Sequence, residues 1–381
     1  MTGAGLLSGG RHQQAGRGQG VGEQAAQAWL FGPRQPLPVH VPPVRGESTG
    51  SYVSRLAHGQ GLQLEELLER VGFGQASRDP ARVRAYPSTT ELYVNEQGLE
   101  YLAVLCGSTA RALQEDLPST AAHLLEPTTG MEPVWTWPWL PRQGHLVPLC
   151  GTCAAVGGVH ETVWMISPDR WRVCLEHLRF TDSDSTGGTW GLSLKLLPET
   201  IAAHREREVL HRRYGPAGEE LFADAFQITV HWWTHLPGTP RWVQRARDAG
   251  LRAHAVPTAP LVLMPEAAAV AAHLAAFEHA NKRDGQARTR WMDQMREQMD
   301  QWGVDFPVGR WALMDWLQRH SVPAAATSEA AGERSRRPAS GVGLPQELRL
   351  SPGHTQVAQP TEVLGAASCL PWQLGQPACD M

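Results

Sequence analysis

Two short pairs of side chains that can bind a metal stand out in the middle of this 381-residue sequence. Cys150 and Cys153 form a Cys-x2-Cys pair, and Cys174 and His177 form a Cys-x2-His pair one hairpin's length further along the chain. Such pairs can supply the four ligands of one tetrahedral zinc ion. Three thiolates and an imidazole leave no position for water or substrate, so the spacing predicts a structural zinc ribbon. The alternative is four unrelated reduced side chains, but their pairing favours the metal.

Two other motifs could carry chemistry, and the surrounding residues argue against both. The stretch around Ser48 matches the GxSxG pattern of serine hydrolases, but the prolines at 42 and 43 cannot belong to the buried strand that this motif requires. We predict that Ser48 caps a helix instead. His231 and His235 lie one helical turn apart, without the glutamate of HExxH or an evident third ligand. We predict no catalytic residue and no enzymatic activity.

Composition limits the classes of protein that the chain can belong to. Hydrophobic residues make up 42% of the sequence and charged residues 19%, and the formal charge is −4, so the chain as a whole is no strong electrostatic attractor of nucleic acid. No apolar run is long enough to span a membrane, and the first residues do not resemble a signal peptide. We therefore expect a cytoplasmic protein without a membrane partner, in which paired cysteines bind metal rather than form disulfides.

The N-terminal half contains two helix–turn–helix patterns. Apolar residues at helical spacing predict one pair of helices from Ser51 to Gly72 and a second pair from Leu99 to Leu117, with glycines at the turns. The second helix of each pair is rich in carboxylates, whereas a helix that reads the DNA major groove presents basic and amide groups. These units are better suited to docking a protein, or they leave DNA contacts to other parts of the chain.

The C-terminal half is predicted to be helical, with arginines on its exposed faces. If the protein contacts nucleic acid directly, we expect Arg205, Arg212, Arg241 and Arg245 to do so. The alternative is that these arginines lie on solvated faces and pair with nearby glutamates.

The predicted fold is mainly α, with helix-turn-helix units at the N-terminus, a small central zinc ribbon and a C-terminal helical domain. The expected segments are a disordered leader (1–36), the N-terminal domain (37–126), the ribbon (127–182), the helical domain (190–320) and a disordered tail (321–381).

The combination of these motifs resembles the TniQ family of transposon-encoded proteins. The resemblance runs from Leu37 to Phe180. It rests on Gly46-Glu47-Ser48, on Ser54-Arg55-Leu56-Ala57, and on a ribbon that closes with Trp171-x2-Cys174-x2-His177. The family's usual prolines after the first ribbon cysteine and before the last glutamate are replaced here by Gly151 and Leu175.

This resemblance implies a function that composition and spacing cannot supply. TniQ proteins are accessory factors that link target recognition to an AAA+ ATPase and its transposase, and some are coupled to CRISPR effectors. The expected function is therefore a non-catalytic zinc adapter in DNA transposition, whose partners are the ATPase, the transposase and target DNA, and which has the capacity to form a homodimer. The alternative is a sequence-specific transcriptional regulator that binds DNA through its helix-turn-helix units and its ribbon.

Overall fold

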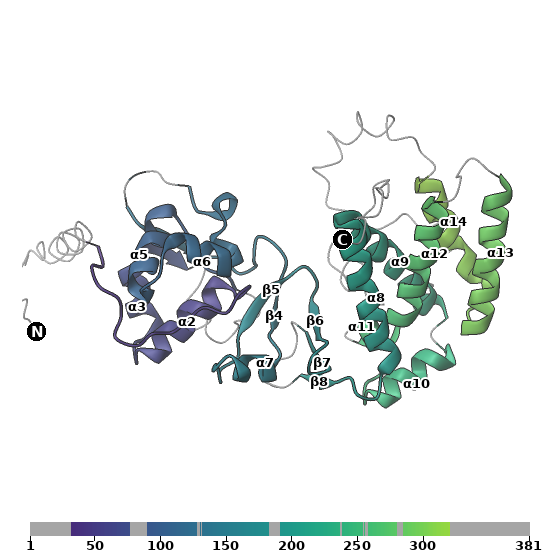
Figure 1. Cartoon of the computed structure of the whole chain (residues 1–381), viewed down its shortest axis with the longest axis horizontal. Helices are drawn as coiled ribbons and strands as arrows, with labels where there is room; N and C mark the ends of the chain where they lie inside the picture. The colour runs from purple at the N-terminus through teal and green to yellow at the C-terminus, as the bar shows by residue number, and fades with distance from the viewer. Residues whose placement is uncertain are drawn as a thin grey trace, which may run out of the picture. The chain divides into compact units, whose positions relative to one another are not determined.

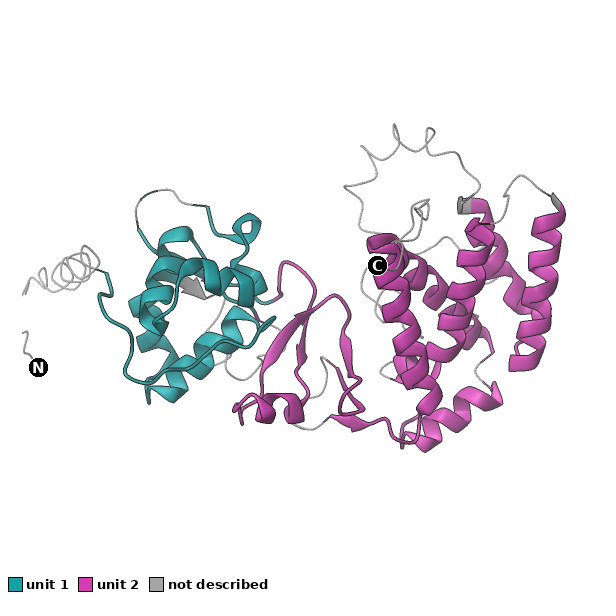
Figure 2. Cartoon of the chain, in the orientation of Figure 1, with its two compact units in different colours: residues 1–85, 91–139 teal, residues 86–90, 140–381 magenta. Residues whose placement is uncertain are grey.

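The computed structural model describes residues 32–76, 90–127, 130, 132–182, 191–236, 238–253, 255, 258–279 and 285–320. Most of the predicted leader, the predicted tail, and Cys369 and Cys379 lie outside these residues. The chain divides into two compact units, formed by residues 1–85 with 91–139 and by residues 86–90 with 140–381 (Figure 2). It is mostly helical, as the sequence predicts (Figure 1).

The helices of the first unit lie where the apolar spacing predicts them. They are α2 (Thr49–Gly59), α3 (Leu64–Val71), α5 (Glu96–Cys106) and α6 (Ala110–Asp116). Ser48 caps α2 as predicted, because its hydroxyl accepts a 3.0 Å hydrogen bond from the Ser51 N–H. Gly107 ends α5 in the left-handed conformation, which glycine adopts without steric cost. The leucines of these helices share one core.

A small sheet that the sequence patterns do not predict completes the first unit. Strand β3 (Val134–Trp137) lies between β1 (Phe73–Ala76), which runs parallel to it, and β2 (Tyr93–Val94), which runs antiparallel. Trp135 and Trp137 alternate along β3 into the core, and the Trp135 indole N–H donates to the Gly72 carbonyl at 2.9 Å. These tryptophans are therefore core residues of the first unit.

The second unit begins with short strands around the cysteine pairs. Strands β4 (His145–Pro148) and β5 (Trp164–Ser167) form one antiparallel pair. Helix α7 (Gly151–Val156) lies in the connection between them. A second antiparallel sheet has the order β6 (Trp171–Cys174), β7 (Arg179–Asp182) and β8 (Leu192–Ser193). Strands β6 and β7 form the hairpin whose turn carries the last two predicted ligands of the ribbon.

A bundle of helices forms the rest of the second unit (Figure 1). Its helices are α8 (Pro198–Tyr214), α9 (Pro216–His235), α10 (Pro240–Asp248), α11 (Ala259–Val262), α12 (Met264–His279), α13 (Gly285–Trp302) and α14 (Phe306–His320). The middle of α9 is buried on nearly every side, so this helix is the centre of the bundle. Gly309 allows α14 to approach it closely, and its carbonyl accepts a 2.9 Å hydrogen bond from the Trp232 indole.

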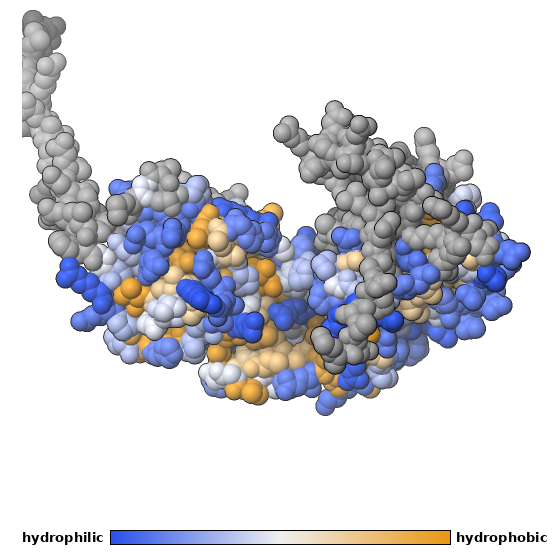
Figure 3. Space-filling view, turned by 45° about the horizontal axis from the view of Figure 1, so that its top comes forward, coloured by the Kyte–Doolittle hydropathy of each residue, from blue (hydrophilic) through white to orange (hydrophobic). Residues whose placement is uncertain are grey.

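Polar residues cover much of the molecular face in Figure 3, with smaller apolar patches between them. None of the helices in the described ranges combines the length and the apolar character needed to cross a bilayer.

Candidate metal centre

Local secondary structure positions each of the four predicted ligands. Cys150 directly precedes α7, and Cys153 lies in the first turn of that helix. Cys174 ends β6, and His177 lies in the turn between β6 and β7. The chain reaches the cluster from two directions, and each arm contributes one of the pairs predicted from the sequence.

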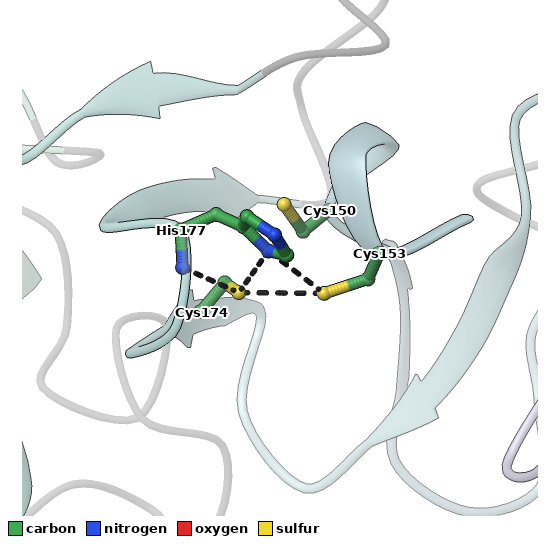
Figure 4. A group of neighbouring side chains, drawn as sticks. All are labelled: Cys150, Cys153, Cys174 and His177. Carbon is green, nitrogen blue, oxygen red and sulfur yellow. Dashed lines mark hydrogen bonds between the residues drawn. The ribbon is translucent and has the colours of Figure 1, made fainter. Parts of the chain in front are cut away.

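The structure brings the four side chains together (Figure 4). Their ligand atoms all lie within 4.8 Å of one another. The Cys153 sulfur is 3.5 Å from the Cys174 sulfur and 3.2 Å from the His177 Nδ1, and the Cys174 sulfur is 3.5 Å from the same nitrogen. A tetrahedral zinc site places two sulfurs about 3.8 Å apart and a sulfur and a nitrogen about 3.5 Å apart. The cluster therefore has the dimensions of a site for one ion.

The turn between β6 and β7 has the form that a Cys-x2-His ligand pair requires. The His177 N–H points to the Cys174 sulfur at 3.4 Å, so the backbone folds back over the first ligand of the pair. Leu178 follows with a φ of 51°, the one positive value among the non-glycine residues that the structure describes. This left-handed conformation costs a leucine about 1 kcal/mol or more. It closes the turn, and the side chain then packs against the helical core.

The electrostatics of the cluster favour a cation. Burial, together with the thiols of Cys174 and Cys150, raises the pKa of Cys153 to about 12. Burial also opposes ionisation of Cys150, but the backbone N–H groups of Cys153 and Thr152 outweigh it and lower the pKa of this thiol. Three thiolates so close together therefore repel one another in the absence of a positive charge. A bound divalent ion reverses this balance, because it deprotonates its thiol ligands.

The donor set fits zinc and a structural role. Three sulfurs and one imidazole nitrogen are soft and borderline ligands that suit Zn²⁺, and they complete a tetrahedron without an open position. The cluster is the one such group of three or more metal-binding side chains in the described residues. The nearby histidines 145 and 160 do not belong to it. Zinc bound here would hold α7 against the β6–β7 turn.

The sheet that carries Cys174 has two distinct faces. Trp171 and Phe180 project from one face into the core of the helical bundle, where Trp171 makes an edge contact with His204. On the opposite face the Thr181 hydroxyl donates to the Pro148 carbonyl at 2.7 Å, which joins β7 to the end of β4 just before Cys150. The ligands and the helical core thus share β6.

The GxSxG stretch has a structural role in this fold. Glu47 is fully buried and accepts two hydrogen bonds from the Arg55 guanidinium, at 2.8 and 2.6 Å. The Ser51 hydroxyl and the Val44 N–H donate to the same carboxylate. Ser48 is occupied as the cap of α2. The residues that carry the family resemblance therefore anchor the start of the first helix, and nothing in their contacts points to a nucleophile.

The predicted nucleic-acid arginines differ in their surroundings. Arg205, Arg212 and Arg241 are exposed. Arg245 is only 7% exposed, and its guanidinium donates to both carboxylate oxygens of Glu266, at 2.5 and 3.0 Å. A guanidinium held in this way is not available to a phosphate. The predicted direct contact with nucleic acid is therefore limited to the three exposed arginines. For them it stays a prediction.

The histidine pair of α9 packs beside core tryptophans, as its sequence context suggests. The rings of His231 and His235 lie 4.2 Å apart between centroids. Burial, with a smaller effect of His235, lowers the pKa of His231 to about 4, so its imidazole is neutral at physiological pH. No third ligand joins the two among the described residues.

The fold and the cluster define a mostly helical protein with a cysteine–histidine cluster that could hold one metal ion. Comparison with known families matches residues 38–180 to TniQ. The match covers both the helices of the first unit and the four clustered side chains, so residues 38–180 form a TniQ domain. No curated protein and no solved structure matches the chain.

Proposed function

We propose that the chain is a non-catalytic, zinc-containing adapter that links recognition of a transposition target site to an AAA+ ATPase and a transposase. The observation that carries this proposal is the closed four-ligand cluster inside the TniQ domain. Its ligands saturate a tetrahedral ion, which suits a structural metal and leaves no coordination position for catalysis.

The surface of the first unit supports a role in binding protein. Glu66 and Glu69 are exposed on α3, and Glu115 is exposed on α6. These carboxylates would repel a phosphate backbone, whereas they suit a basic surface on a protein partner. Exposed Arg111 lies beside Glu115 at 3.2 Å and offsets part of this charge.

The second candidate function is sequence-specific DNA binding by a regulator, and the exposed arginines of α8 and α10 favour it. Arg205, Arg212 and Arg241 would contact phosphates and make affinity depend steeply on salt, because each neutralised phosphate releases condensed counterions. An adapter that docks an ATPase loses less affinity over the same range of salt. Cytoplasmic location and homodimer formation also remain predictions, and sedimentation of the purified chain tests the latter.

The experiment that separates the two functions compares two ligands over one salt series. The purified chain would be titrated with an AAA+ ATPase of a transposition system and, separately, with a DNA duplex, between about 50 and 300 mM salt, the range in which phosphate contacts weaken. The adapter function predicts ATPase binding that persists across the series. Tight, strongly salt-dependent duplex binding without any ATPase binding would refute it.

The metal site has its own test, which does not depend on partners. We expect the wild-type chain to purify with one zinc ion, and Cys174→Ser to lose bound zinc and to expose the backbone amides between Cys150 and Phe180 to hydrogen exchange. The physical reason is that a hydroxyl is a poor zinc ligand and that metal binding folds such modules. His160→Ala is the matched control, because this exposed histidine lies outside the cluster. Elemental analysis showing undiminished zinc in Cys174→Ser would remove this residue from the site.

A further inference from the structure

We propose that Arg172 supplies the positive charge that balances the metal centre, and that this charge slows the release of zinc from its four ligands. The inference rests on the proposed zinc site and assigns a function to a residue that is not itself a ligand.

Strand geometry places Arg172 on the metal-binding face of the sheet. Side chains alternate along β6, so Arg172 and Cys174 share one face, while Trp171 and Val173 share the other. The face of Trp171 is filled by the helical core. The cross-strand partner of Arg172 is Thr181, whose hydroxyl reaches the end of β4 beside Cys150. Arg172 is therefore directed to the side of the sheet on which the ligands gather.

Arg172 is a half-buried cation that lacks an ionic partner in the part of the chain that the structure describes. Its neighbours have clear partners: Arg207 pairs with Asp169 at 2.7 Å, and Arg179 donates to the Gly191 carbonyl at 3.3 Å. No carboxylate or carbonyl plays this part for the guanidinium of Arg172 among the described residues. Burying a charge without compensation is costly, so its placement here calls for a negative group nearby.

The metal centre is such a group. A zinc ion with three thiolates and one neutral imidazole carries a net charge of −1, and the ligands are themselves only partly exposed. Burial lowers the pKa of the Arg172 guanidinium, while Cys153 and Cys174 raise it, so both sulfurs lie within electrostatic reach of the group. The cation and the anionic centre would therefore stabilise each other. A positive charge beside the thiolates lowers their affinity for protons and, with it, their intrinsic nucleophilicity toward electrophiles.

The alternative role for Arg172 is packing. Arg172 is also one of the residues around a cavity of about 240 Å³ at the edge of this sheet, and its stem could serve mainly to fill space. Methionine preserves most of the length of the stem and removes the charge, whereas lysine keeps the charge and loses the planar fork. The pair of substitutions Arg172→Met and Arg172→Lys thus separates charge from packing. Arg170, which is exposed two positions earlier, provides the control variant Arg170→Met.

The experiment measures zinc release from the full-length, zinc-loaded chain after addition of excess chelator, with a colorimetric zinc indicator. Mass spectrometry follows the alkylation of Cys153 and Cys174 by N-ethylmaleimide in parallel. We expect Arg172→Met to release zinc about tenfold faster than wild type at low salt and to alkylate faster, with Arg172→Lys and Arg170→Met close to wild type.

Several outcomes would overturn the proposal. Equal release from wild type and Arg172→Met would show that the charge has no effect, and equal acceleration in Arg172→Met and Arg172→Lys would assign the effect to packing. If Arg172→Met fails to retain zinc during purification, an Arg172→Lys chain that loses zinc to the same extent would still refute the role of charge. A wild-type chain that purifies without zinc would refute the metal site itself, which is a different failure.

Discussion

Replacing Arg55 by methionine should loosen the first unit, because it leaves a buried carboxylate without its cation. The Arg55 and Glu47 side chains are 7% and 0% exposed, and two hydrogen bonds of 2.8 and 2.6 Å join them. After the substitution the Ser51 hydroxyl and the Val44 N–H would still donate to Glu47, but no cation among the described residues would replace Arg55. Removing one partner of a buried ion pair costs about 3–5 kcal/mol. The sequence motif that carries the family resemblance would then be a stability element of the first helix.

Hydrogen exchange on the full chain measures this effect unit by unit. We expect peptides from α2 and α5 to exchange about 100-fold to 4,000-fold faster in Arg55→Met, since each 1.4 kcal/mol is about a factor of ten, while α9 in the second unit is unchanged. The double variant Glu47→Gln/Arg55→Met should recover part of the loss, because no charge remains buried there.

A solvent-exposed ion pair in the same unit provides the control. The side chains of Arg111 and Glu115 are 89% and 66% exposed, and such a helical pair contributes only about 0.3–0.5 kcal/mol. Arg111→Met should therefore leave exchange almost unchanged. If Arg55→Met altered the exchange of α2 no more than Arg111→Met does, the reasoning from burial would be refuted.

Two further predictions concern a buried acid and a close helix contact. Burial raises the pKa of Glu91 to about 7, although the N–H groups of Gly50 and Leu92 donate to it. Between these pH values the folded state therefore keeps a proton that the unfolded chain releases, and the stability of the first unit should fall as pH rises from about 4.5 to about 7. Urea unfolding should show a weaker dependence of stability on pH in Glu91→Gln, because the amide does not titrate. Gly309→Ala should destabilise the second unit by about 1–3 kcal/mol in thermal unfolding, because the added Cβ would lie 2.2 Å from the end of the fully buried Met299 side chain and 3.0 Å from the Trp232 indole nitrogen, which its hydrogen bond to the Gly309 carbonyl holds in place; a melting temperature equal to that of wild type would contradict this.

The features that the sequence revealed are local. The cap by Ser48, the helices of the first unit and the two ligand pairs each depend on residues within a few positions of one another, and short-range patterns predict such features well. The approach of the two pairs to each other was predictable as well, because a closed tetrahedral set requires it.

The features that the sequence missed depend on distant partners. Strand β1 pairs with β3, which lies about 60 residues away, and neither strand is long enough to show a clear alternation. Helix α9 lacks a polar stripe because the bundle surrounds it, so its apolar period is weak. In the sequence, Arg245 does not differ from the other arginines of the C-terminal half. Only the fold shows that its guanidinium pairs with Glu266 in the core.

Because side chains alternate between the two faces of β6, a metal bound here would stabilise more of the fold than it would in a ribbon with a separate core of its own. Trp171 and Cys174 lie on opposite faces of one short strand, so the position of the ligand is fixed by the packing of the tryptophan against the helical bundle. The packing of the bundle would in turn depend on the bound metal. Metal bound to Cys174 and His177 would hold the turn that places Leu178 against the same bundle. A zinc ion at this point would therefore stabilise the contact between the strands and the helices, which is the rigid connection that the proposed adapter function requires.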